Sequence, residues 1–148
     1  MAGNATPIFT KNGRIESVLV TAANTSSAGG GTVATNIFKA ATADATNDSF
    51  VEYVRWIPGA TAATTTTATV GRVFASSITS GSTTSADTIL LAEVALPATA
   101  ADNASTAVNT IDIALNIRLP AGWTILATNH AAPAANTNWR LVVPIADY

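Results

Sequence analysis

The segment Val108–Leu119 carries a regular alternation of apolar and polar residues, and it constrains the fold more than any other feature of the sequence. Its large aliphatic residues stand at every second position: Ile111, Ile113, Leu115, Ile117 and Leu119. Side chains of a β-strand point alternately to opposite faces, so this spacing predicts a long strand with one face in a core.

Shorter segments follow this pattern less cleanly, and Phe50–Ile57 is apolar on both faces except at Glu52 and Arg55, which two-sided burial or one face in an interface would explain. We expect strands at Ile15–Ala22, Val33–Ala40, Phe50–Ile57, Ala68–Ala75, Leu90–Leu96, Trp123–Thr128 and Trp139–Ile145, with a short edge strand at Ile8–Lys11. Lys11–Arg14 contains Asn-Gly, which favours a tight hairpin, and Pro58-Gly59 is expected to end a strand. No apolar stripe repeats at the helical period. The sequence predicts an all-β protein, a β-sandwich of jelly-roll type with eight or nine short antiparallel strands, and an up-and-down barrel is the alternative.

The length of 148 residues suits one domain. The polar stretches Ala23–Gly31, Ser76–Asp87 and Ala98–Ala107 are too short to separate two domains, and we expect them to be surface loops. We therefore expect a single β-sandwich domain over residues 1–148. Residues 1–8 have no evident core role and are interpreted as an N-terminal arm that reaches a neighbour.

Charged residues are scarce, at 11% of the chain, and the formal net charge is −2. Without a basic field, we expect neither nucleic acid nor a membrane surface as a partner. The N-terminal residues lack the basic and apolar regions of a signal peptide, and no apolar run is long enough to span a bilayer. These features predict a soluble protein made in a cytoplasm. A weakly charged surface also suits a protein that packs against neighbours.

No grouping of residues predicts catalysis, and we expect no enzyme, no cofactor and no metal. The chain has no cysteine, and its one histidine, His130, stands in an expected turn without nearby acidic partners. Asp44 and Asp48 lack the ligand pattern of a calcium loop and are expected in a solvated turn. Gly29–Gly31 precedes a strand and not a Lys-Ser/Thr helix start, so it predicts a flexible loop and not a phosphate cradle.

Arginines inside the expected strands are the strongest candidates for contacts. An arginine in mid-strand can pair across strands on a solvent face, or it can bind a neighbouring subunit through its planar fork. Both possibilities stay open. Trp56, beside an arginine, is the first choice for an interface anchor, whereas Trp123 and Trp139 are expected to fill the core. The candidate interface residues are Arg55, Trp56, Tyr53, Arg72, Arg118 and Arg140.

Three segments give the chain a resemblance to small structural proteins of tailed-bacteriophage virions. They are Phe50–Pro58, Ile111–Trp123 and Asn138–Tyr148, joined by Thr-, Ala- and Ser-rich connectors. The resemblance implies a jelly-roll-like protein located on the virion and made in the host cytoplasm. Capsid cement or decoration is the commonest role for such a chain. It further implies a homo-oligomer, with a trimer favoured, that binds the major capsid protein or other virion proteins. The family brings no catalytic residues.

Two alternatives remain on sequence grounds. The chain could be a neck, tail or head-fibre component, because these parts share the sandwich architecture. It could also be a receptor-binding or carbohydrate-binding module that uses loops and tryptophans. Fold alone does not choose between these functions.

Overall fold

The computed structural model describes residues 10–60, 65–99, 110–134 and 137–148. These residues form strands and connecting loops, and no helix among them is long and apolar enough to cross a membrane. The proposed N-terminal arm, the expected strand at Ile8–Lys11 apart from its last two residues, and most of the 98–107 loop lie outside the described residues. The strands are β1 (Asn12–Val20), β2 (Gly31–Thr32), β3 (Phe38–Thr42), β4 (Ser49–Ala60), β5 (Thr69–Ser76), β6 (Ser82–Thr83), β7 (Thr88–Leu96), β8 (Ile111–Leu119), β9 (Thr124–Asn129) and β10 (Thr137–Asp147).

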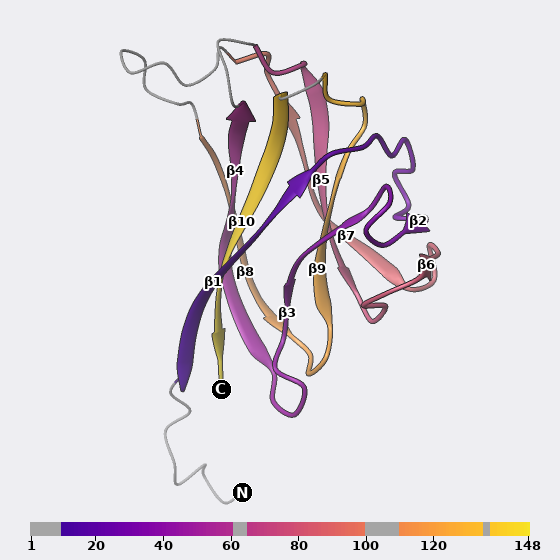
Figure 1. The fold of residues 1–148 in the computed structure, drawn as a ribbon. Coiled ribbons are helices and arrows are strands. Elements are labelled where there is room, and N and C mark those ends of the chain that lie inside the picture. The colour runs from indigo at the N-terminus through magenta and orange to yellow at the C-terminus, as the bar shows by residue number, and fades with distance from the viewer. Residues whose placement is uncertain (1–9, 61–64, 100–109, 135–136) are drawn as a thin grey trace, which may run out of the picture.

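Eight of these strands form two four-stranded antiparallel sheets that pack as a sandwich (Figure 1). Sheet I has the order β1-β10-β4-β8, and sheet II has the order β3-β9-β5-β7. The pairing is nested, because β1 pairs with β10, β3 with β9, β4 with β8 and β5 with β7. The two-residue strands β2 and β6 pair with each other beside sheet II. The predicted all-β sandwich is confirmed, with ten strands where eight or nine were expected.

The core lies between the sheets and is filled by alternate residues of each strand. Strand β8 follows the predicted alternation and ends at Leu119 as expected, and its five aliphatic side chains pack toward sheet II. Trp56 and Trp139 are fully or almost fully buried there. A Cβ on Gly71 of the facing sheet would come within 3.0 Å of the Trp56 ring. The close approach of the two sheets at this point therefore requires glycine.

A second, smaller core lies on the opposite side of sheet II. Ile37, Phe74 and Leu126 are fully buried there, and Val33 packs against them. The covering chain runs from the end of β1 through β2 and is joined to β6. The Asn24 N–H donates to the Asn129 carbonyl at 2.7 Å, which fixes this cover to sheet II.

Three sequence interpretations are corrected by the fold. Lys11–Arg14 is not a hairpin, because Asn12, Gly13 and Arg14 lie in β1 and pair with β10. Pro58-Gly59 does not end a strand, since β4 continues to Ala60. The register with β10 places Pro58 opposite Trp139 within this strand. Val33–Ala40 is not one strand, because Ala34 has a φ of 67° and β3 begins only at Phe38.

The glycine triplet Gly29–Gly31 forms a hydrogen-bonded part of the cover over sheet II. The Thr83 hydroxyl donates to the Gly29 carbonyl at 2.7 Å, and the Gly30 N–H donates to Ser26 Oγ at 3.1 Å. Gly29 has a φ of +76°, and a Cβ there would lie 2.3 Å from Thr88 Oγ1. The prediction of a loop holds, and Gly29 has no room for a side chain because its backbone lies against Thr88 of sheet II.

Candidate interaction surface

The outer face of sheet I carries many apolar side chains that do not belong to the core. Because strand residues alternate, the neighbours of the core residues in β1, β10, β4 and β8 point outward. Ile15 on β1 is the most exposed large hydrophobic residue of the described chain, at 76%. Half-buried Phe50, Pro144 and Ala146 lie beside it on the neighbouring strands.

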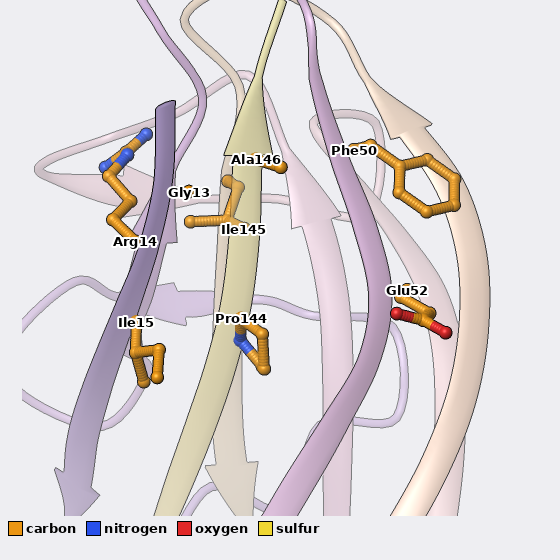
Figure 2. A pocket seen from close by; sticks show the side chains of 8 residues that line it. All are labelled: Gly13, Arg14, Ile15, Phe50, Glu52, Pro144, Ile145 and Ala146. Carbon is orange, nitrogen blue, oxygen red and sulfur yellow. The ribbon is translucent and has the colours of Figure 1, made fainter. Parts of the chain in front are cut away.

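These residues line a groove of about 600 Å³ that runs over β10 between β1 and β4. Figure 2 shows Ile15, Pro144 and Glu52 following one another across β1, β10 and β4. The groove is lined by Gly13, Arg14, Ile15, Phe50, Glu52, Pro144, Ile145 and Ala146.

Residue size explains why the face is hollow at this place. Gly13, Ala146 and Phe50 are direct cross-strand neighbours, so two small residues stand next to a large ring. In the next row, Ile15 pairs with Pro144. The groove therefore has a floor of small or flat residues on β10 and walls made by the side chains of Ile15 and Phe50.

An irregularity in β4 adds an acidic group to the groove. The register between β10 and β4 shifts between Val142 and Ala146. Val51 and Val54 are both fully buried, so Glu52 and Tyr53 between them both lie outside the core. The shift falls opposite Pro144, which has no N–H for the ladder. The bulge thus brings the Glu52 carboxylate to the rim of the groove.

Ion pairs lie at the edge of the apolar face, on the side of β8. Arg55 Nε and Nη2 donate to the two carboxylate oxygens of Asp112 at 2.6 and 2.7 Å. This bidentate bond holds the pKa of Asp112 below its usual range. The Arg55 guanidinium also lies 5.6 Å from the centre of the Tyr53 ring. The guanidinium of Arg55 therefore contacts Asp112 and Tyr53 of its own chain, while 39% of the Arg55 side chain stays exposed.

Arg118 and Arg140 complete the polar frame. Arg118 Nε lies 2.6 Å from Asp48 Oδ2, and its guanidinium lies 5.4 Å from the centre of the Tyr148 ring. Arg140 Nη1 donates to Ser17 Oγ at 3.2 Å. Four of the six predicted interface residues therefore share the outer face of sheet I: Arg55, Tyr53, Arg118 and Arg140.

The other two candidates have different positions. Trp56 is fully buried in the core, so the choice of this residue as an interface anchor is corrected: it fills the space beside Gly71. Arg72 is only 6% exposed and lies on the outer side of sheet II. Its Nε donates to Glu93 at 2.5 Å, and its Nη1 lies 3.5 Å from the Asn24 carbonyl oxygen. Arg72 therefore fastens the cover of sheet II and is not a surface group.

The groove residues Ile15, Phe50 and Pro144 were not among the predicted candidates. A usable signal exists in β4, because Phe50, Tyr53 and Ile57 are large residues outside the core spacing of Val51, Val54 and Trp56. Ile15 and Pro144 give no such signal, since each joins the groove only through the pairing of β1 with β10.

The acidic groups of the described residues serve mainly in local structure. Asp147 accepts hydrogen bonds from Arg14 Nε at 3.0 Å and Ser49 Oγ at 2.5 Å, and the bond from Arg14 is the main reason that its pKa is lowered. Asp44 accepts from the Thr46 and Asn47 N–H groups in a turn, as expected. Within the described ranges, no group of three His, Asp or Glu side chains could hold a metal ion.

Comparison with known proteins assigns no family to the chain. No protein-family profile matches it, and no curated protein is significantly similar. One similar solved structure is a chain described as "Cyanophage Pam1 capsid asymmetric unit", with 14% identity, a TM-score of 0.42, and coverage of 99% of this chain and 92% of that chain. A TM-score of this size does not establish a common fold, and the likeness transfers no function to this chain.

Proposed function

We propose that the chain is a non-enzymatic structural protein of a bacteriophage virion, a capsid cement or decoration protein that stabilises the shell by binding across coat subunits. The observation that carries this proposal is the bare apolar groove on sheet I, framed by Arg55, Arg118 and Arg140. Apolar surface with arginine and tyrosine at its edge is the composition typical of protein interfaces.

Two further features support the proposal. The nested pairing of β1 with β10, β3 with β9, β4 with β8 and β5 with β7 is the order that we interpret as a jelly roll, an architecture common in viral capsid proteins. The sequence also resembles small virion proteins of tailed phages in three segments that form β4, β8 and β10. On this proposal the protein resides on the virion and assembles as a homo-oligomer, with a trimer favoured.

The proposal is tested by light scattering after size exclusion, with and without tail-free capsid shells. We expect an oligomer that co-migrates with shells at a fixed stoichiometry. A monomer that does not bind shells would contradict the cement role. Oligomers that ignore shells but bind tail or neck parts, or saturable binding to glycans, would indicate one of the two alternative functions.

A matched pair of variants links the test to the proposed surface. Ile15→Asp places a charge in the groove, whereas Ile89→Asp places the same charge on β7 of sheet II, where the side chain is also exposed, at 54%. We expect Ile15→Asp to weaken self-association, and with it shell binding, by at least about tenfold, since a charge must lose water to enter an apolar contact. The Ile89→Asp variant should bind as the original chain does.

A further inference from the structure

We propose that the groove on sheet I receives the N-terminal segment Met1–Phe9 of a second copy of the chain. This inference rests on the proposed self-association and names the contact that produces it. The groove is lined by Gly13 and Ile15, which lie at the beginning of β1. The segment that precedes β1 is therefore attached next to the groove of its own copy.

The direction of β1 carries the segment away from that groove. The Lys11 N–H donates to the Asp147 carbonyl at 2.6 Å, so the pairing of β1 with β10 includes Lys11. Asp147 is the last residue of β10. Traced backward from Lys11, the chain thus leaves the sheet at the end where β10 stops. Phe9, four residues before Gly13, would stand roughly 13 Å beyond it in an extended chain.

Return of the segment to its own groove requires a sharp reversal just before Lys11. Tight turns are favoured by Gly, Asn, Asp and Pro. The residues there are Ile8, Phe9 and Thr10, which are β-branched or aromatic and favour extended backbone. A reversal would also place Ile8 and Phe9 in the turn, away from the groove. The groove of a neighbouring copy requires no such turn.

The chemistry of the segment suits the groove. Residues 1–9 contain no charged side chain, and Pro7, Ile8 and Phe9 form its apolar end. They match the apolar walls made by Ile15 and Phe50. In an extended chain Phe9 and Lys11 point to the same side. With Phe9 in the groove, Lys11 of the donor copy lies near the Glu52 carboxylate on the rim of the receiving copy, so the charges are complementary.

Such an exchange can also build a closed ring of few subunits. Where each copy gives its segment to one neighbour and receives the segment of another, the contact is head-to-tail. Head-to-tail contacts form rings when the rotation closes. A trimer is the ring size that the proposed function favours.

The absence of cysteine from the chain allows a direct test by disulfide formation. A Phe9→Cys chain is mixed with an equal amount of an Ile15→Cys chain under mild oxidation. The control mixture pairs Phe9→Cys with Lys39→Cys, an exposed position on β3 of sheet II. We expect at least about tenfold more mixed disulfide with Ile15→Cys, because docking raises the local concentration of the two thiols. Equal yields in the two mixtures would overturn the inference.

A chain with both Phe9→Cys and Ile15→Cys distinguishes exchange from self-docking. We expect disulfides that join separate chains. Exclusive formation within one chain would show that the segment occupies its own groove, which contradicts the exchange. Light scattering of the original chain separates the two proposals: a monomer would defeat the proposed function itself, whereas an intact oligomer without preferential disulfides would overturn only this contact.

Discussion

The outer faces of the two sheets differ in what covers them, although both carry large apolar residues. On sheet II, Phe74 and Leu126 are fully buried beneath the loop that includes Val33 and Ile37, and all six residues of β9 are buried. On sheet I, β10 alternates between buried and partly exposed residues, and Ile15 on the neighbouring β1 is 76% exposed. The chain thus covers β9 and the Phe74 part of sheet II by itself and leaves the outer face of sheet I open.

This difference separates side chains that stabilise the fold from side chains that are available for contact. The cover of sheet II is tied down by a buried arginine, Arg72, and by glycines that allow close packing. The arginines of sheet I remain partly exposed at the edge of a groove. Residues on the covered face should govern folding, and residues on the open face should govern association. Four predictions test this division, in order of decreasing effect on the stability of the free chain.

Removal of a large side chain from the covered face should have the largest effect. Phe74→Ala leaves a cavity between sheet II and its cover, and we expect the free energy of unfolding to fall by about 3–5 kcal/mol. Denaturant unfolding followed by tryptophan fluorescence measures this change. A loss below about 1 kcal/mol would mean that the cover is not a packed second core.

The glycines of the cover provide the next test. Gly29→Ala combines a φ of +76° with a clash against Thr88, and we expect a loss of about 2–3 kcal/mol. Gly81→Ala is the matched control, because Gly81 has a φ of +78° and no atom near its Cβ position. It should lose only about 1 kcal/mol through backbone strain. Equal losses would show that contact with Thr88 contributes nothing.

Acid should loosen sheet I before sheet II. The pKa of Asp147 is lowered, chiefly by the hydrogen bond from Arg14. Its stabilising contribution is therefore complete above the unfolded-state pKa of about 3.9, and it is lost as the pH falls below that value toward the folded-state pKa. Hydrogen exchange of β1 and the end of β10 should rise in this range, while β9 stays protected. In Asp147→Asn this difference in acid sensitivity should disappear.

The open face should tolerate truncation. Phe50→Ala removes a groove wall that touches no core residue of sheet II, and we expect it to change the free energy of unfolding by less than about 1 kcal/mol. Its self-association should weaken by about tenfold, as for a side chain that contributes at the centre of an interface. A Phe50→Ala variant that unfolds easily but associates normally would contradict the assignment of the outer face of sheet I to association.

Much of the fold follows from local patterns in the sequence. The alternation and the end of Ile111–Leu119 were predicted, because a strand with one buried face leaves a simple pattern. Most other strands were located within a few residues, with the exception of Val33–Ala40. The short strands β2 and β6 were missed, since two-residue pairs such as Gly31–Thr32 carry no periodicity. The error at Asn12-Gly13 has a tertiary cause: β1 finds its partner in β10, at the far end of the chain.

The candidate surface was predicted only in part. Arg55, Arg118 and Arg140 were predicted as contact residues because a charge in mid-strand is unusual. They share the outer face of sheet I. Arg72 carries the same signal but lies under a cover that no local pattern reveals. The groove arises from Gly13, Ala146 and the bulge at Glu52, whose meeting depends on the register of three strands. The register between strands that lie far apart in the sequence cannot be read from a single sequence.

The pairing of the first strand with the last has a consequence for the order of events during synthesis. Strand β10 lies between β1 and β4, so sheet I cannot close until Thr137–Asp147 has left the ribosome. Contacts so distant in sequence also form slowly. Until then neither the groove nor its framing arginines are assembled as one surface. A growing chain therefore has no groove to offer its neighbours, and binding at this surface is delayed until the receiving subunit has finished folding.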